Sequence, residues 1–148
     1  MKVFELPAET KAATGFTHKC VIGHADLTVS AADTDQTIEL LAVEAGDFLE
    51  KAAFKLVTPF EDLSDTGLND TQVQIGDGGD TDRFITATQV NDNGTEIYYK
   101  TCVPTVPYAY TAADTIDILV ESMAAKSLSD IDAGELNVFL SIQKLSDL

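Results

Sequence analysis

Residues 45–58 read Ala45-Gly46-Asp47-Phe48-Leu49-Glu50-Lys51-Ala52-Ala53-Phe54-Lys55-Leu56-Val57-Thr58. The apolar residues that recur at even positions are Phe48, Ala52, Phe54 and Leu56. Lys51 and Lys55 take alternate positions. Successive side chains of a β-strand point to opposite faces of a sheet, so this spacing predicts a half-buried strand rather than a helix. Pro59 has no N–H to give to a sheet, and it predicts the end of this strand.

The stretch that follows is polar and rich in turn-forming residues. Between Lys55 and Arg83 it carries seven acidic residues and no basic one. Residues 71–75 predict a short strand within it. The glycines and aspartates of residues 76–82 predict a solvated loop, after which ordered structure resumes at Arg83.

Length and charge limit the possible classes of protein. The chain has 148 residues, which fits one domain with a core of its own. It has 25 acidic and 9 basic residues and a net charge of −16. Binding to phosphates or to anionic lipids needs clustered Lys and Arg, so we expect neither a nucleic-acid partner nor a membrane partner.

The N-terminal residues 1–15 show no sustained periodicity. We expect them to form a flexible or extended arm that orders on a partner, and we expect residues 16–148 to form a single domain. The apolar run after Met1 is too short for a signal peptide, which predicts a soluble protein made in a cytoplasm. Cys20 and Cys102 are too few for a disulfide framework, and two buried thiols or one bridge both fit the sequence.

Short alternating segments recur along the rest of the chain. Strands are predicted at residues 16–22, 37–43, 84–90, 95–100, 115–121 and 135–143, with a possible continuation of the first strand at residues 25–30. Asn93-Gly94 predicts a tight hairpin between two of them. Long helical patterns are absent from the sequence. About eight strands separated by turns predict an all-β fold, an antiparallel β-sandwich or jelly roll.

Leu119 and Phe139 depart from the alternation of their strands. Each lies on the side opposite the apolar set of its own strand, beside polar residues. If the two strands are neighbours, these side chains form a small apolar spot on a polar sheet. Such a spot is a candidate subunit contact, and the alternative is that a loop or the N-terminal arm covers it.

Two groups of residues raise the question of a metal ion. His18, Cys20 and His24 lie on one predicted strand, where ligands in a line cannot surround zinc unless Cys102 joins them. A second group, Asp77, Asp80 and Asp82, offers oxygen atoms to calcium, but its spacing departs from an EF-hand loop. Ordinary strand and turn residues explain both groups, so we expect no cofactor.

Catalytic motifs are also missing from the sequence. Gly76, Gly78 and Gly79 are not followed by the Gly-Lys-Ser/Thr of a phosphate loop, and the neighbouring aspartates repel phosphate. Neither a nucleophile elbow nor a spaced Ser/His/acid set is present. We therefore expect that the protein is not an enzyme.

Three stretches of the sequence together resemble a known family of proteins. They are Ala45-Gly46-Asp47 leading through an alternating strand to Phe60, then Ile75-Gly76-Asp77-Gly78-Gly79-Asp80-Thr81-Asp82-Arg83-Phe84-Ile85, and then Tyr110-Thr111-Ala112-Ala113-Asp114-Thr115-Ile116-Asp117. In this order and spacing they resemble small β-sandwich structural proteins of tailed-bacteriophage virions, in particular head decoration or cement proteins. The resemblance extends from about Ile38 to Ile142.

The resemblance implies a non-enzymatic function. Decoration proteins are often trimeric, and they bind the outside of the capsid where subunits of the major capsid protein meet. In this chain the candidate contact residues are Phe4 and Leu6 in the N-terminal arm, together with Leu119 and Phe139. A tail or fibre component is the alternative within a virion, and a calcium- or carbohydrate-binding β-sandwich module is the alternative outside it.

Overall fold

The computed structural model describes residues 1–65, 67–68, 70–92 and 94–145. Ten strands lie in this part of the chain: β1 (Lys2–Glu5), β2 (His18–Gly23), β3 (Gln36–Val43), β4 (Phe48–Glu61), β5 (Gln72–Asp77), β6 (Asp80–Gln89), β7 (Tyr99–Cys102), β8 (Tyr108–Ala109), β9 (Asp114–Glu121) and β10 (Ala133–Gln143). The helical elements are α1 (Ala8–Thr14) and the 3-10 turns η1 (His24–Asp26) and η2 (Leu128–Asp130).

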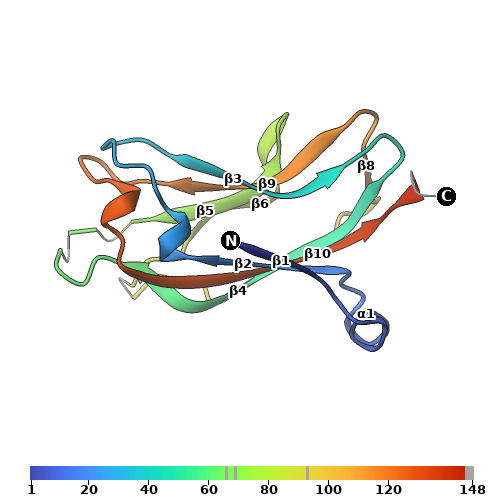
Figure 1. The fold of residues 1–148 in the computed structure, drawn as a ribbon, viewed down its shortest axis with the longest axis horizontal. Coiled ribbons are helices and arrows are strands. Elements are labelled where there is room, and N and C mark those ends of the chain that lie inside the picture. Colours follow the sequence, from blue (N-terminus) through green and yellow to red (C-terminus); the bar gives the residue numbers. More distant parts are fainter. Residues whose placement is uncertain (66, 69, 93, 146–148) are drawn as a thin grey trace.

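The strands form two sheets that face each other (Figure 1). Sheet A has the order β1-β2-β10-β4-β7, with β8 also paired to β4, and sheet B has the order β3-β9-β5-β6. All pairs of these strands are antiparallel. With β1 and β8 set aside, sheet A has the order β2-β10-β4-β7 and sheet B has the order β3-β9-β5-β6. Two facing four-stranded sheets with these orders form a jelly roll. The predicted antiparallel β-sandwich is confirmed, with ten strands rather than about eight.

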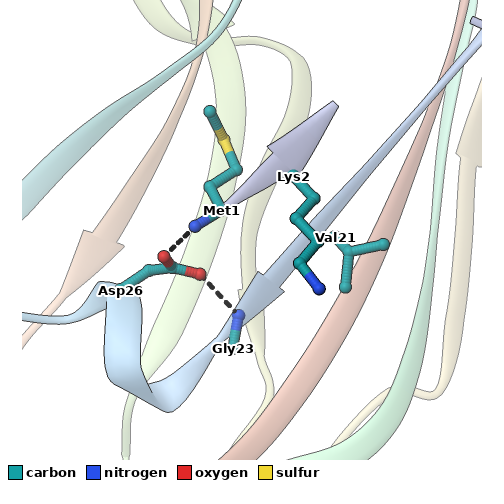
Figure 2. A pocket seen from close by; sticks show the side chains of 5 residues that line it. All are labelled: Met1, Lys2, Val21, Gly23 and Asp26. Atoms are coloured by element: carbon teal, nitrogen blue, oxygen red, sulfur yellow. Dashed lines mark hydrogen bonds and ion pairs between the residues drawn. The ribbon is translucent and has the colours of Figure 1, made fainter. Parts of the chain in front are cut away.

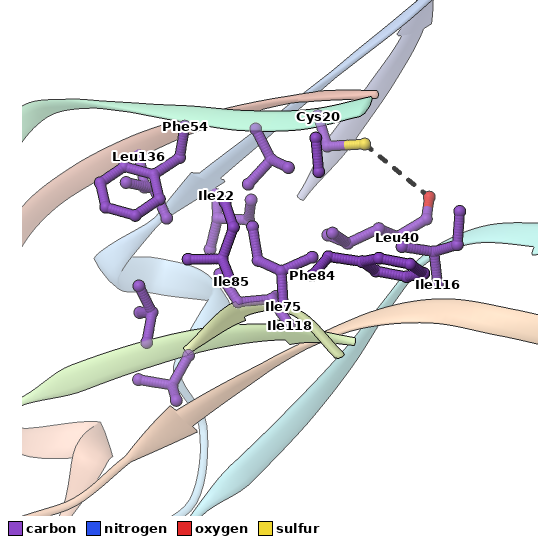
Figure 3. Close-up of a cluster of buried hydrophobic side chains, with 14 of the residues drawn as sticks. Cys20, Ile22, Leu40, Phe54, Ile75, Phe84, Ile85, Ile116, Ile118 and Leu136 are labelled. Atoms are coloured by element: carbon purple, nitrogen blue, oxygen red, sulfur yellow. Dashed lines mark hydrogen bonds between the residues drawn. The ribbon is translucent and has the colours of Figure 1, made fainter. Parts of the chain in front are cut away.

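The core lies between the two sheets. Phe54, Ile22 and Leu136 from sheet A meet Ile75 and Ile118 from sheet B, and all are at most 2% exposed (Figure 3). Removing a side chain of this size from water stabilises a fold by about 1.5–3 kcal/mol. The alternation of β9 and β10 places their apolar sets in this core, as the sequence predicts.

β4 departs from the predicted pattern at two points. A register shift against β10 near Lys51 puts Leu49, which is fully buried, into the core and leaves Phe48 only half buried. The prediction that even-numbered residues of this strand face the core is therefore wrong at Phe48. One extra residue in a bulge reverses the direction of the side chains that precede it. The strand also passes Pro59 and ends at Glu61, since Pro59 lies where the register with β10 is irregular and no ladder donor is needed.

The N-terminal residues have regular structure. β1 pairs with β2 at the edge of sheet A, and α1 lies on the outer side of that sheet (Figure 1). Within residues 1–15, Lys2–Glu5 form β1 and Ala8–Thr14 form α1, a helix that the sequence did not predict. α1 ends at Gly15, which has φ of +70° and donates its N–H to the Lys11 carbonyl.

Two turn predictions are wrong. β6 and β7, which flank residues 91–94, belong to different sheets, so they do not form a hairpin; Asn93 lies outside the described residues. The tight hairpin instead joins β5 to β6 through Gly78-Gly79, where the sequence predicted a solvated loop.

The predicted continuation of the first strand is also absent. After β2, residues 24–26 form the turn η1 rather than a continued strand. A second 3-10 turn, η2, precedes β10.

Candidate functional site

The outer side of sheet A carries lysines and aromatic rings. One row across the sheet pairs Phe4 with Lys19, Lys19 with Phe139, and Phe139 with Ala53. We call this surface the lysine face. Its residues are Lys2, Lys19, Lys51 and Lys55 with Phe4, Phe16, Tyr99 and Phe139. Their neighbours along the strands, such as Cys20 and Val138, point into the core, which directs the lysine face outward.

An apolar pocket lies on this face beneath α1. It has a volume of about 250 Å³ and is lined by Leu6, Thr10, Thr14, Phe16 and Phe139. The rings of Phe16 and Phe139 are 5.7 Å apart at an angle of 46°. The structure thus brings together Leu6 and Phe139, two of the predicted contact residues, and the N-terminal segment partly covers Phe139.

Lysines of this face lie over aromatic rings. The Nζ of Lys51 is 4.4 Å from the centroid of Phe16 and donates a hydrogen bond of 2.6 Å to the Thr14 carbonyl. Lys19 lies 6.0 Å from the Phe139 centroid, and Lys55 lies 5.9 Å from the Tyr99 centroid. A ring face attracts a cation but does not neutralise it, so the ammonium groups keep their full charge for a partner.

The lysine face differs from the rest of the molecule in its ion pairs. In the described part of the chain, no carboxylate forms an ion pair with any of its four lysines. Of the other five basic residues, four are ion-paired: Lys11 with Glu5, Arg83 with Asp77, Lys126 with Asp65 and Lys144 with Asp47. The fifth, Lys100, donates hydrogen bonds to Thr86 and Thr88.

The amino terminus closes one end of this face. The terminal amine of Met1 forms an ion pair with Asp26, whose other oxygen accepts a hydrogen bond of 2.9 Å from the Gly23 N–H (Figure 2). Lys2 and Val21 complete the lining of a pocket of about 260 Å³ there. These contacts attach the start of β1 to the end of β2. Phe4 in β1 stays 47% exposed at the sheet edge.

The outer side of sheet B is acidic. Asp117 and Glu121 of β9 point outward together with Leu119, because Ile116, Ile118 and Val120 point into the core. Glu39 pairs with Asp117 across β3 and β9. We call Glu39, Asp117 and Glu121, with Asp35 at the end, the acidic face. Leu119 is half buried there, beside Thr37 and Gln74.

Leu119 and Phe139 therefore lie on opposite outer sides of the sandwich. The single apolar spot predicted from the sequence does not form, because β9 belongs to sheet B and β10 to sheet A. Similar alternation in two strands does not show that they are neighbours. Each residue stays a separate candidate for a contact.

Burial and like charge weaken ionisation on the acidic face. Burial raises the pKa of Asp117 above its usual range, and the nearby Glu39 and Asp114 raise it further. Burial and Asp35 likewise raise the pKa of Glu121, against a hydrogen bond from Gln74 that lowers it. Carboxylates close together in a partly buried surface resist a second negative charge.

The three aspartates of the predicted calcium group have different surroundings. Asp77 is 1% exposed; its Oδ1 accepts hydrogen bonds of 3.0 Å from the N–H groups of Gly79 and Asp80, and its Oδ2 lies 2.6 Å from the Arg83 Nε. Asp80 and Asp82 are exposed. A cation at Asp77 would have to displace Arg83, so the arrangement serves as a brace for the hairpin.

The predicted zinc residues also lie apart. Cys20 is in the core, where burial raises the pKa of its thiol to about 11, and both Cys20 and Cys102 are free thiols. They lie in β2 and β7, which β10 and β4 separate. The His18 ring contacts the Thr17 hydroxyl at 2.8 Å, and His24 begins η1.

Metal-ligating side chains do not cluster in the described residues. These residues contain no group of three or more His, Cys, Asp or Glu side chains placed to hold a metal ion. No helix among them has the length and apolar character needed to cross a membrane.

Comparison with known proteins supports the fold. Neither a protein-family model nor a curated protein matches the sequence. Among solved structures, a chain of the cyanophage Pam1 capsid asymmetric unit is similar, with a TM-score of 0.58 and 15% identity over 82% of this chain and 79% of that chain. A chain of the acid-stable capsid of Helicobacter pylori bacteriophage KHP30 matches with a TM-score of 0.47 and 14% identity, over 84% of this chain and 90% of that chain. At 15% identity, the likeness to the Pam1 chain shows a shared fold.

Sequence reasoning missed part of the lysine face. It placed Lys51 and Lys55 opposite the apolar set of their strand, which was a correct signal. It gave no role to Lys19 or Phe16, because their neighbours come from distant parts of the chain. Lysines that alternate with apolar residues in more than one strand could have indicated a shared outer face.

Proposed function

We propose that this protein is a structural component of a tailed-phage virion that binds the outside of the capsid and stabilises it as a decoration protein. The observation that carries this proposal is the likeness of its jelly roll to a chain of the cyanophage Pam1 capsid asymmetric unit, which extends over 82% of the sequence. The resemblance of residues 45–60, 75–85 and 110–117 to decoration proteins points the same way.

In this function the protein acts by linkage and not by catalysis. A protein that binds the intact shell but not its broken form stabilises the shell, and the effect grows with concentration. Repetition of one weak contact around a symmetric shell adds avidity. The partner is then the major capsid protein, and the protein itself is a homo-oligomer, with a trimer as the favoured state.

The N-terminal segment and the lysine face are the docking surface that this function requires. Phe4 lies at the free edge of sheet A, and Leu6 and Phe139 line the pocket beneath α1. On the opposite side, Leu119 is available for a contact between copies. An acidic exterior elsewhere suits a protein that stays away from the packaged nucleic acid.

Co-sedimentation tests the proposal. Purified protein is mixed with capsids assembled without it and spun through a cushion, and we expect it to pellet with the shells at a fixed stoichiometry. Absence from the pellet at micromolar concentration would reject the capsid function. Gold labelling of whole particles separates the tail alternative, since a tail component would be labelled away from the head.

Deletion of residues 1–14 tests the role of the N-terminal segment. We expect occupancy of the shell to fall while the truncated protein stays folded by circular dichroism. Unchanged occupancy would remove β1 and α1 from the docking surface without affecting the proposed function as a whole.

A further inference from the structure

We propose that the lysine face and the pocket beneath α1 together bind an acidic polypeptide segment, which places one large apolar side chain in the pocket. This deepens the proposed function, on which it depends for the source of the segment, by naming the chemistry of the partner. Charge complementarity and the apolar pocket carry the inference.

The first argument is the local charge. On the strands of this face, four lysines and two carboxylates, Glu50 and Glu135, give a charge of +2, and Glu9 in the first turn of α1 reduces the local charge to +1, on a chain of net charge −16. The paired Glu5 and Lys11 at its edge cancel each other. At physiological salt, charges interact over about 8 Å, and two packed sheets are about 10 Å apart. A partner at this face therefore meets the lysines rather than the acidic face behind them.

The second argument is that these lysines have no carboxylate partner within the described residues. The other cations of the chain have carboxylate or hydroxyl partners, but these four are left to rings, to a carbonyl or to solvent. In a protein so rich in carboxylates, such a group is available for acidic side chains of another chain. Asn137 lies between Val21 and Lys55 on the same face, and its buried Oδ1 has no hydrogen-bond partner within the described residues.

The third argument is the pocket. Its volume of about 250 Å³ and its apolar exposed lining suit one large apolar side chain. A cavity of roughly 150 Å³ lined by apolar side chains is enough to hold benzene. Because Lys51 lies 4.4 Å from the Phe16 ring that lines the pocket, a segment seated there has a cation beside it for a flanking carboxylate.

A single-stranded nucleic acid is the other polyanion that lysines and rings on a sheet could bind. Such binding needs several open ring faces for stacking. Here Phe16 and Phe139 pack on each other, and lysines lie over Phe16, Phe139 and Tyr99. Glu50 and Glu135 would also meet the phosphates. The face therefore favours a polypeptide.

Fluorescence anisotropy at 50 mM salt tests the inference. The probe is a labelled peptide of eight alternating Asp and Glu residues with one central Phe, and the comparison probes replace Phe by Ser, replace the acids by Lys, or are an oligothymidylate. We expect saturable binding of the acidic Phe peptide. Lys19→Gln with Lys55→Gln should weaken it by about tenfold, since each charge at the surface contributes modestly. Phe→Ser in the peptide should weaken it by at least threefold.

The matched control is Thr37→Glu with Ala87→Glu. It makes the same change in net charge at exposed positions of sheet B, and it should leave binding unchanged. Equal weakening in both variants, no saturation by the acidic Phe peptide, or tighter binding of the oligothymidylate would overturn the inference. Thermal melting of each variant checks that it is folded.

The shell assay separates this inference from the proposed function. If the peptide binds the lysine face but the protein does not pellet with shells, the proposed capsid function is rejected and the proposed peptide-binding surface is kept. If the protein pellets equally well with and without Lys19→Gln and Lys55→Gln, the function stands and the inference fails.

Discussion

The two outer sides of the sandwich carry charges of opposite sign. On the lysine face, four cations lie without carboxylate partners, beside aromatic rings that are exposed (Phe4, Tyr99) or half buried (Phe16, Phe139). Around sheet B, carboxylates crowd together on the acidic face, while Asp77 at its hairpin is buried against Arg83. Both sides come from one strand pattern, in which every second residue points outward.

This difference separates charges that hold the fold from charges that are free to bind. A buried carboxylate that accepts three hydrogen bonds cannot be removed without leaving its partners unsatisfied. An exposed lysine over a ring can be removed at little cost to folding. We therefore expect stability to depend on sheet B charges and binding to depend on sheet A charges.

The largest expected effect follows from removal of the hairpin brace. Asp77→Ala removes the nearer of the two carboxylates paired with Arg83, leaving only Asp80 at 3.9 Å, and it frees two backbone N–H groups. We therefore expect the free energy of unfolding to fall by about 3 kcal/mol. Urea denaturation measures it, with the exposed Asp82→Ala as control at less than about 0.5 kcal/mol. A loss below about 1 kcal/mol for Asp77→Ala would contradict a structural function for this charge.

A second substitution compares backbone packing in the two sheets. A Cβ at Gly76 would overlap the backbone of Asp80 and Thr81, so Gly76→Ala should destabilise the fold by about 2 kcal/mol. In sheet A, a Cβ at Gly23 meets only the Gly134 carbonyl, at 3.9 Å, and Gly23→Ala should change stability by less than about 0.5 kcal/mol. Equal effects in urea denaturation would contradict the difference in packing between these two positions.

A smaller effect is expected where α1 covers sheet A. Phe16→Ala removes the contact with Phe139 and the ring beneath Lys51, and we expect a loss of about 1.5 kcal/mol, well below the 3–5 kcal/mol typical of a core Phe. Phe4→Ala, at the exposed edge, is the control and should be nearly neutral. A full core-sized loss at Phe16 would mean that this face is a second core and not an open surface.

The smallest effect concerns the acidic face and has the opposite sign. Because burial raises the pKa of Asp117, the folded protein holds this proton more tightly than the unfolded chain, and stability falls as pH rises from about 4 through the raised pKa. Asp117→Asn should therefore stabilise the protein at pH 7, by less than about 1 kcal/mol, and the gain should shrink towards pH 4. Unfolding curves at both pH values, with Asp82→Asn alongside, measure it. A gain that is independent of pH would contradict the assignment to ionisation.

Much of the fold could be predicted because alternation is a local property. Ile116, Ile118 and Val120, and likewise Leu136, Val138 and Leu140, are buried as their spacing predicts. The bulge in β4 was not predictable, since a shift of one residue depends on the partner strand β10. The hairpin at Asn93-Gly94 was wrong for a similar reason: turn chemistry competes with the pairing of whole sheets, and sheet membership decided the outcome.

The candidate site was predicted only in part. Phe4 and Leu6 were predicted as contact residues of the N-terminal arm, and Phe139 as an apolar residue on a polar side of its strand. The structure places all three on one side of sheet A. Leu119 was assigned to the same spot, but it lies on sheet B. The predicted solvated loop became a hairpin with a buried ion pair, because Asp77 is placed next to Arg83 only after β5 and β6 have paired.

By itself, the order of residues determined that this chain is built of short strands, that it is strongly acidic, and which side of each strand is apolar. These properties depend on neighbours two to four positions away. The tertiary structure alone decided which strands share a sheet, and so which lysines and rings meet on one face. Such choices depend on contacts between residues more than 100 positions apart, as between Lys19 and Phe139, and no local pattern encodes them.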